Sequence, residues 1–300
     1  MVDIETTDRG DVMSSKAREP AVTGWGPDGR RGAVSFTFDN LGEASDIEFG
    51  KWPDDQPIGS HMSVTQVVPE LLERLRGIQA TFFVEAWNAT VYPRALRAMA
   101  DAGHQVALHG LRHELWAPLD SQRQVEVLER SLEAMATAGL RPIGFRPPGG
   151  YGSDNLAELM RRYGFTHFSC VGEGSSNIAM EGVVSMPFTW PFVDGNQLEE
   201  RIGARWNIKP GADGQFGPSL LRQVFTGEID RAAQAGVHVV FDFHPWIIGQ
   251  NRERMEAMFS IVAHARSRPD IWVASCREVA DWMLVQKPMA CADIPGRKPR

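Results

Sequence analysis

The chain of 300 residues is 43% hydrophobic and 23% charged, which is the composition of a globular protein of enzyme size. Its formal net charge of −7 gives no electrostatic reason to expect nucleic acid or an anionic membrane as a partner. The three cysteines are scattered and odd in number. They argue against a disulfide framework or a cysteine-based zinc site and for a reducing compartment.

Residues 1–30 are polar and punctuated by glycine and proline, without the apolar segment of a signal peptide. No later window is long and apolar enough to span a bilayer. We therefore expect a flexible leader over residues 1–30, a single barrel domain over 31–285 and a loose tail over 286–300. This pattern predicts a cytoplasmic protein without a membrane partner, and it leaves a homo-oligomer open.

Short buried strands alternate with amphipathic helices along the rest of the chain. Strands are predicted at 33–38, 80–84, 105–108, 143–145, 165–168, 183–186, 237–243 and 271–273. Helices are predicted at 64–76, 93–102, 121–138, 155–163, 219–235, 252–266 and 276–285, with loops at 41–63 and 195–217. This alternation predicts an α/β fold with parallel strands and right-handed crossovers, and seven or eight such units favour a barrel over an open sheet.

Polar side chains gather directly after the predicted strands, and they are Asp39, Asn40, Glu85, His109, His113, Arg146, Asp194 and His244. In a (β/α) barrel the carboxyl ends of the strands form the face that carries the active site. The shared position of these residues therefore predicts one polar site at that face.

His109 and His113 are the most informative pair among them. Two histidines four residues apart lie on one face of a helical turn, so both imidazoles can reach one metal ion. Such pairs also occur as surface accidents or as structural histidines, and the metal interpretation depends on the residues around them.

The order of five motifs resembles the polysaccharide deacetylase (NodB homology) family, the enzymes of carbohydrate esterase family 4. The motifs are Phe36-Thr37-Phe38-Asp39-Asn40, His109-x-x-x-His113, Arg146-Pro147-Pro148-Gly149, the pair Trp190 and Asp194, and His244-Pro245. The resemblance spans roughly residues 31–282. The segment after His244 looks closer to the branch with allantoinase-like and cyclic-imide hydrolases and peptidoglycan deacetylase-like proteins.

The resemblance implies a distorted (β/α)7 barrel that hydrolyses an amide with a divalent metal. It implies that Asp39 is the general base, that Arg146 orients this base and that His244 is the general acid. Asp194, with Trp190, is expected to tune that acid and to line the pocket. The chemistry fits these roles, because amide hydrolysis needs an activated water, a stabilised oxyanion and a protonated leaving amine.

The resemblance also implies three metal ligands, namely Asn40, His109 and His113, and we expect Zn²⁺ there. Asn40 departs from the family, whose usual motif has a second aspartate at this position. An amide oxygen is neutral and a poorer ligand than a carboxylate. Three readings stay open: Asn40 ligates weakly, metal is dispensable, or a carboxylate of the following loop substitutes, which would be Glu43, Asp46 or Glu48.

Further residues near the strand ends are expected to contact substrate, and they are Trp190, Trp246, Pro147, Gly149, Trp87 and Trp116. The tryptophans of this group, together with Trp206, form either an aromatic wall for a sugar ring or heterocycle or part of the packing of the barrel rim. The predicted function is metal-dependent removal of an acyl group from an amino sugar or a sugar-containing small molecule. The alternatives are a ring-opening hydrolase of cyclic imides or ureides, with metal dispensable, and a catalytically inactive binding protein.

Overall fold

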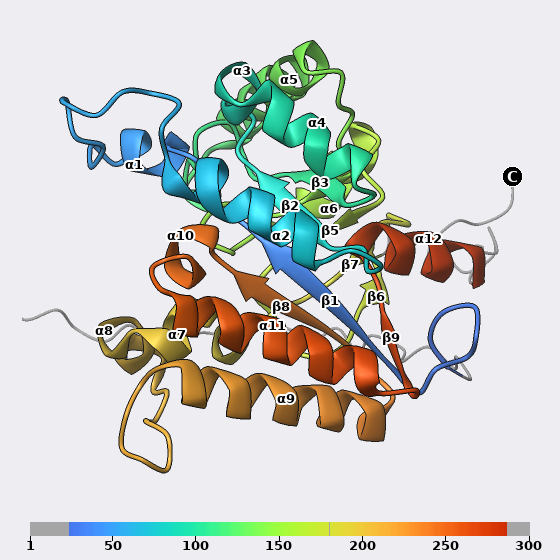
Figure 1. Cartoon of the computed structure of the whole chain (residues 1–300). Coiled ribbons are helices and arrows are strands. Elements are labelled where there is room, and N and C mark those ends of the chain that lie inside the picture. Colours follow the sequence, from blue (N-terminus) through green and yellow to red (C-terminus); the bar gives the residue numbers. More distant parts are fainter. Residues whose placement is uncertain (1–23, 180, 287–300) are drawn as a thin grey trace, which may run out of the picture.

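The computed structural model describes residues 24–179 and 181–286 of the chain (Figure 1). Residues 1–23 of the expected leader and 287–300 of the expected tail lie outside this part. Within the described residues, no helix has the length and apolar character that crossing a membrane requires.

A curled sheet of nine strands forms the centre of the molecule, in the order β6-β7-β5-β4-β3-β2-β1-β8, with β9 paired to β1. The strands are β1 Gly32–Phe38, β2 Thr81–Val84, β3 Gln105–Leu108, β4 Gly144–Phe145, β5 His167–Phe168, β6 Asn177–Ile178, β7 Val184–Ser185, β8 His238–Phe243 and β9 Ile271–Val273. Every pairing is parallel except that of β6 with β7. This arrangement confirms the predicted distorted (β/α) barrel.

Helices cover the outside of the sheet (Figure 1). The longer ones are α2 Val68–Arg74, α4 Pro93–Asp101, α5 Ser121–Thr137, α6 Leu156–Arg162, α9 Pro218–Ala235, α11 Arg252–Ser267 and α12 Cys276–Gln286. Local capping fixes where two of them begin, because the side chains of Asp120 and Asn251 accept hydrogen bonds from the backbone of Arg123 and Arg254. All seven match predicted helices to within a few residues.

Strand β1 separates the apolar core from the polar interior of the barrel. Its alternate residues Phe36 and Phe38 pack with Phe241 and Phe243 of β8. The residues between them face the other way, and the hydroxyl group of Thr37 donates to Asp242 at 3.2 Å. The period-2 alternation of a strand thus places apolar rings under the helices and polar groups inside the barrel.

The predicted loop 195–217 is wrong in part, because it contains the end of α7 Asp194–Leu198, α8 Glu200–Gly203 and the 3-10 turn η3 Ala204–Trp206. No hydrophobic periodicity marks these short helices. Polar side chains fix the segment instead, since Asn196 and Gln197 donate to the backbone carbonyls of Trp190 and Pro191. Three further short helices fall in predicted loops or turns, and they are α1 Ala44–Glu48, α3 Asn88–Val91 and α10 Pro245–Ile248.

The barrel does not close by a regular strand pairing between β8 and β7. Between them lies the 3-10 turn η2 Trp190–Phe192, and a single bridge joins Val193 to Asp242 of β8. This bridge brings Asp194, the next residue, beside the carboxyl end of β8 and His244. The incomplete closure of the barrel therefore positions one side of the candidate site.

Candidate active site

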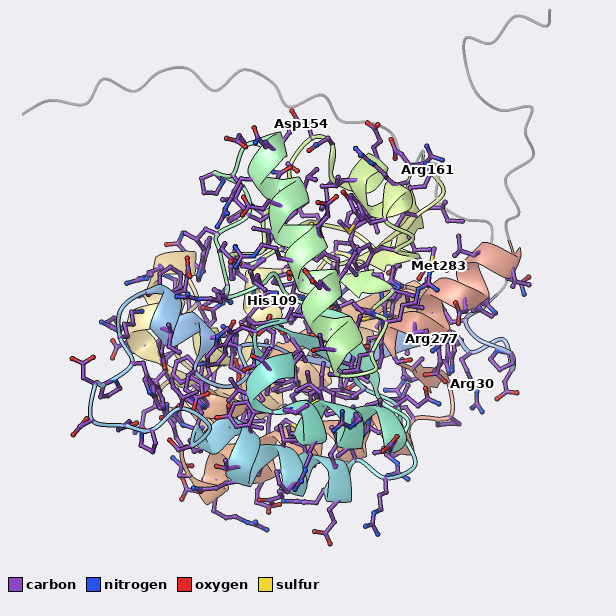
Figure 2. The ribbon with its side chains drawn as sticks, turned by 90° about the horizontal axis from the view of Figure 1, so that it is seen from above. Arg30, His109, Asp154, Arg161, Arg277 and Met283 are labelled. Carbon is purple, nitrogen blue, oxygen red and sulfur yellow. The ribbon has the colours of Figure 1, made fainter. Side chains whose placement is uncertain are left out.

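The carboxyl ends of β1, β2, β3, β4 and β8 converge, as the barrel interpretation predicts. They bring together Asp39, Glu85, His109, Arg146 and His244, all of which are buried or nearly so. Figure 2, seen from above, places His109 in the interior of the molecule. These residues come from segments more than 200 positions apart in the chain, and the fold makes one polar cluster of them.

Asp39 is the centre of this cluster. Its Oδ2 lies 3.4 Å from Nη1 of Arg146 and 3.7 Å from Nε2 of His109. Its Oδ1 lies 3.1 Å from Nε2 of His244. Burial alone would raise the pKa of Asp39, but His244, His109 and Arg146 outweigh it and lower this pKa to about 2. Asp39 is therefore an ionised carboxylate at neutral pH, as a general base must be.

His244 is held by a second carboxylate, that of Asp194. The ring nitrogen Nδ1 of His244 lies 2.7 Å from Oδ1 of Asp194, and the backbone N–H of His244 donates to Oδ2 at 2.8 Å. Burial lowers the pKa of His244, but the charges of Asp39 and Asp194 more than offset this effect and raise the pKa to about 10. The imidazole therefore carries a proton on Nε2, toward Asp39, at neutral pH. The structure brings Asp194 and His244 together, and the catalytic roles predicted for them stay predictions.

Arg146 is fully buried, with its guanidinium group between the rings of Phe83 and Phe188 at 4.3 and 4.6 Å. It donates to Ser169 at 3.1 Å and forms an ion pair with Asp242 that is closer than its contact with Asp39. Asp242 is a site residue that the sequence analysis missed. The signal was a single carboxylate in an otherwise apolar strand, two positions before His244 and therefore on the same face of β8.

The helical turn predicted for the histidine pair is wrong. Gly110 and His113 have φ angles of 72° and 78°, which an α-helix excludes, and residues 109–113 form a loop. The side chain of Glu114 stabilises this loop by accepting from the backbone N–H groups of Leu111 and Arg112. The loop still brings the two imidazoles together, with ring centroids 4.8 Å apart.

Both imidazoles have one nitrogen occupied and one free. Nδ1 of His109 lies 2.8 Å from the backbone oxygen of Arg146, and Nδ1 of His113 lies 3.0 Å from Oε1 of Glu85. Both acceptors require a proton on Nδ1, so each Nε2 presents a lone pair. Burial lowers the pKa of His109 to about 3, which keeps its ring neutral.

These residues fit a divalent metal. The possible ligand atoms of Glu85, His109 and His113 lie within 4.8 Å of one another. Asn40 sits in a left-handed turn with φ of 54°, and its Oδ1 is buried without a hydrogen-bond partner. A buried oxygen without a donor is costly unless something else binds it. Two imidazole lone pairs and one amide oxygen are a plausible donor set for zinc.

The three loop carboxylates considered as substitutes for Asn40 have other partners. Glu43 is buried and accepts from the backbone of residues 59–61 and from the hydroxyl of Tyr92. Asp46 lies 3.9 Å from His61, and Glu48 lies 3.3 Å from Arg112. None of the three is grouped with the histidine pair, and the carboxylate that reaches it is Glu85, which directly follows β2.

The tryptophans expected at the substrate pocket divide into two groups. Trp116 is fully buried and packs edge-to-face on Phe145, so it belongs to the core and offers no surface to a substrate. Trp190 is half-buried and stacks on Trp206 with ring centroids 4.1 Å apart and an interplanar angle of 14°. Trp246 is 38% exposed beside the ring of His244. Trp190 and Trp246 remain candidates for substrate contact.

The remaining residues that were predicted to contact substrate are less exposed or have only backbone atoms to offer. Trp87 is half-buried where α3 begins, and its backbone N–H donates to Leu111 of the histidine loop. Pro147 is buried, whereas Gly149 is exposed with φ of 80°. Only Gly149 of these two can face a substrate.

Exposed apolar side chains gather around the site. Five large ones among the described residues are Phe49, which contacts His113, Leu115, two positions after His113, Tyr151 and Trp206, which contact Trp190, and Trp246, which lies beside His244. Phe49 lies edge-on to His113 at 6.0 Å, and Tyr151 accepts a hydrogen bond from Trp190. Grouped exposed apolar side chains mark a binding surface more than scattered ones do. We call these five residues the apolar rim.

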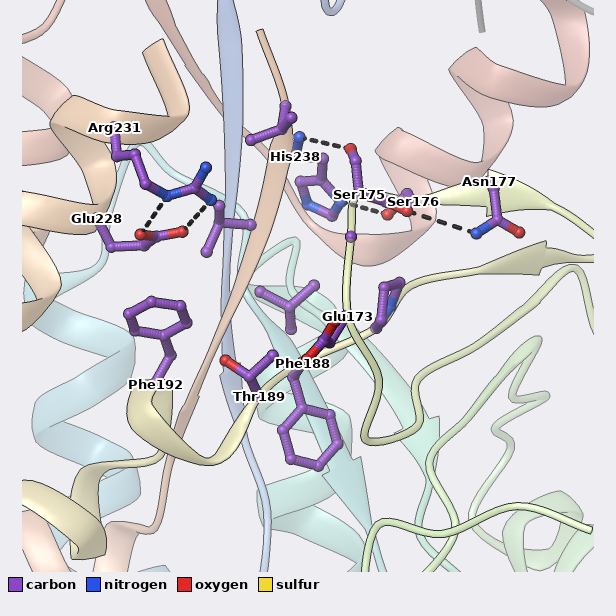
Figure 3. Close-up of a pocket in the computed structure, with 15 residues that line it drawn as sticks. Glu173, Ser175, Ser176, Asn177, Phe188, Thr189, Phe192, Glu228, Arg231 and His238 are labelled. Atoms are coloured by element: carbon purple, nitrogen blue, oxygen red, sulfur yellow. Dashed lines mark hydrogen bonds and ion pairs between the residues drawn. The ribbon is translucent and has the colours of Figure 1, made fainter. Parts of the chain in front are cut away.

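A cavity of about 490 Å³ lies elsewhere, between α9, β8 and the segment around β6 (Figure 3). Four of its polar side chains form pairs: Arg231 with Glu228, and His238 with Ser176. None of the predicted catalytic or metal-binding residues lines it. The cavity is therefore separate from the candidate active site.

The model of the polysaccharide deacetylase family matches residues 28–168. By this match, residues 28–168 form a polysaccharide deacetylase domain. The match contains Asp39, both histidines of the pair and Arg146, and it ends before Asp194 and His244. Asp194 and His244 lie outside the matched residues, and the fold brings them to Asp39.

Two relatives agree with this assignment. The peptidoglycan deacetylase-like protein FGM2 of Gibberella zeae is 32% identical over 90 residues, which cover 30% of this chain and only 27% of that protein. The peptidoglycan deacetylase of Helicobacter pylori is 22% identical over 251 residues, covering 74% of this chain and 85% of that protein. Both support the branch predicted from the segment after His244.

Solved structures share the whole fold. A crystal structure from Mycobacterium smegmatis, assigned to the polysaccharide deacetylases, superposes with a TM-score of 0.77 and 26% identity, covering 91% of this chain and 96% of that one. Puue allantoinase superposes with a TM-score of 0.74 and 18% identity, covering 94% and 100%. At 18% identity the second likeness shows the fold alone. The fold shared with these structures thus extends over the described barrel.

Proposed function

We propose that this protein is a metal-dependent hydrolase that removes an acyl group from the amide nitrogen of an amino sugar or a sugar-containing small molecule. One observation carries the proposal: the carboxylate of Asp39 contacts both Arg146 and His244 while facing His109. The proposed base, the proposed acid and the candidate metal ligands thus surround one small volume, which supports the proposal. A binding protein would not need such an acid–base pair.

His109, His113 and Asn40 would hold the metal. When bound, a zinc ion at such a site supplies Lewis acidity and lowers the pKa of a bound water. The chain's own residues provide the proton transfers. Asp39, kept ionised by its cationic neighbours, accepts the proton of the attacking water. Arg146 holds the carboxylate in place.

His244 supplies the proton that the departing nitrogen needs. Its Nε2 lies on the Asp39 side, and Asp194 fixes the ring from behind through Nδ1. An amine leaves poorly as an anion, so protonation at this atom assists cleavage of the C–N bond. Asp194 therefore orients His244 and keeps it protonated.

The apolar rim supports a substrate that carries a ring. The flat stacked pair of Trp190 and Trp206 lies on one side of the site, and Trp246 lies beside His244. Aromatic side chains present apolar faces that suit the faces of sugars and planar heterocycles. We place the substrate among small molecules and soluble carbohydrates.

Ring-opening of a cyclic imide or ureide is the second candidate, and Asn40 is the observation that favours it. A neutral residue at this ligand position weakens the metal site, and the ring-opening alternative includes hydrolysis without metal. The catalytic roles of Asp39 and His244 would be the same, because the bond cleaved is again a C–N amide bond.

One experiment tests the proposal and separates these candidates. The protein is freed of metal with a chelator, reconstituted with zinc, and assayed on N-acetylated glucosamine oligomers and on allantoin and hydantoin. Zinc-dependent release of acetate supports the proposal. Full activity without metal overturns the metal dependence, and turnover of the cyclic ureides alone assigns the ring-opening reaction.

A further inference from the structure

Glu85 joins the two loops that carry the candidate metal ligands. It lies directly after β2, between the ends of β1 and β3, and is fully buried. Its Oε1 lies 3.0 Å from Nδ1 of His113, and its Oε2 accepts from the backbone N–H of Leu41 at 3.3 Å. Leu41 follows Asn40, so one carboxylate fixes both the histidine ring and the left-handed turn at Asn40.

Besides the ring of His113, Glu85 has two polar partners that are donors in every protonation state, the backbone N–H of Leu41 and the side-chain amide of Asn88. The amide of Asn88 donates to Oε2 at 3.5 Å. These donors suit the ionised carboxylate, which only accepts hydrogen bonds, whereas burial raises the pKa of Glu85. The hydrogen bond to Oε1 also places the proton of His113 on Nδ1 and turns its Nε2 lone pair toward His109.

Within residues 24–179 and 181–286, no arginine or lysine forms an ion pair with Glu85, and its one ion-pair partner is the imidazole of His113. The other buried carboxylates of the site share cations, because Arg146 pairs with Asp39 and Asp242 and His244 pairs with Asp39 and Asp194. A buried carboxylate without a compensating charge is costly. A cation on Nε2 of His113 would provide that charge through the imidazole ring.

We infer that Glu85 is a positioning residue that takes over the electrostatic part of the missing acidic ligand at Asn40. Asn40 offers the metal only a neutral oxygen. Glu85 supplies a negative charge behind His113, on the side of the ring away from the metal. Glu85 also holds the turn that orients Asn40. This inference rests on the metal-binding part of the proposed function. The carboxylate of Glu85 would give the metal site a negative charge that its neutral ligands alone do not supply.

The test is zinc affinity, measured by competition with a chromogenic chelator in the absence of substrate, for Glu85→Gln, Asn40→Asp and the double variant. Removing a carboxylate that orients a ligating histidine lowers metal affinity by about 10- to 100-fold. We expect this loss in Glu85→Gln, and we expect Asn40→Asp to recover at least about 10-fold in the double variant, because it returns a carboxylate to the site. Unchanged affinity in Glu85→Gln, or a loss that Asn40→Asp does not reduce, overturns the inference.

Glu43→Gln is the matched control. Glu43 is equally buried and also accepts backbone N–H groups of its loop, but it does not contact the histidine pair. We expect lower thermal stability and unchanged zinc affinity. An equal loss of zinc affinity in this control would mean that any damage to the region lowers binding, and it would overturn the specific role of Glu85.

If Glu85→Gln does not fold, Glu85→Asp serves in its place, because it keeps the charge and shortens the side chain. We expect a loss of about 3- to 10-fold that Asn40→Asp again reduces; no loss overturns the inference. Zinc binding and turnover are separate readouts. Loss of zinc in Glu85→Gln with undiminished turnover would contradict the proposed metal dependence and leave the role of Glu85 intact.

Discussion

Nε2 of His244 lies 3.1 Å from Oδ1 of Asp39, so the proposed acid and the proposed base contact each other directly. The ion pair keeps Asp39 ionised and His244 protonated, which is the state that amide hydrolysis requires of each. A water molecule and a scissile amide must enter between the two groups. The site is therefore charged correctly before substrate arrives.

The first prediction concerns the pH dependence of kcat/KM. Activity needs Asp39 unprotonated and His244 protonated. The value of kcat/KM should therefore rise to a plateau above the pKa of Asp39, about 2, and should fall as pH rises through the pKa of His244, about 10. Asp194 is one of the three carboxylates that raise the latter pKa, with Asp39 and Asp242. Asp194→Asn should therefore move the alkaline limb down by about 1–3 pH units.

A pH–rate profile of Asp194→Asn beside the unmodified protein checks this expectation. Glu199→Gln is a suitable control, because Glu199 pairs with Arg254 outside the site. An alkaline limb that does not move in Asp194→Asn would show that His244 is not the titrating acid.

The second prediction concerns the stability of the buried arginine. Arg146→Met leaves Asp39 and Asp242 without their shared cation and should lower the free energy of unfolding by about 3–5 kcal/mol, since it isolates buried charge. Asp242→Asn in the same chain removes one of the stranded carboxylates and should recover part of this loss. Urea denaturation of the single and double variants measures both effects. Strictly additive losses would contradict the proposed coupling of Arg146 and Asp242.

The third prediction separates two tryptophans that the sequence placed together. Trp116→Ala should destabilise the protein by about 3–5 kcal/mol, because its ring is fully buried against Phe145. Trp246→Ala should change stability by less than about 1 kcal/mol, because the side chain is 38% exposed, and should raise KM. Thermal or urea unfolding and steady-state kinetics give the two readouts. A stable Trp116→Ala with raised KM would reverse the assignment.

The sequence predicted the frame of the site well. The buried run before Asp39 and the run before His244 are β1 and β8, and period-2 alternation and strand-end polarity are enough to identify both. The convergence of their ends follows from the rule for parallel strands in a barrel. Strand ends and the polar residues that follow them are local features of the chain, so a single sequence is enough to predict them.

What the sequence did not yield depends on contacts between distant residues. The spacing of His109 and His113 is the same in a helix and in a loop, and only the left-handed backbone at Gly110 and His113 distinguishes them. Two pairs in the site join different segments of the chain, Glu85 with His113 and Asp242 with Arg146. No sequence periodicity predicts such pairs. The sequence around Trp116 would suit an exposed tryptophan equally well. Only the packing of its ring shows that it belongs to the core.

The most direct test of the account is Asp39→Asn, assayed together with its zinc content. The variant keeps the size of the side chain and removes the base, so amide hydrolysis should fall by at least about 100-fold while the zinc bound per chain stays at the level of the unmodified protein. Retained turnover would contradict the role of Asp39 as general base. Loss of zinc from the variant would mean that Asp39 is a ligand and that the roles of base and ligand at positions 39 and 40 have been exchanged.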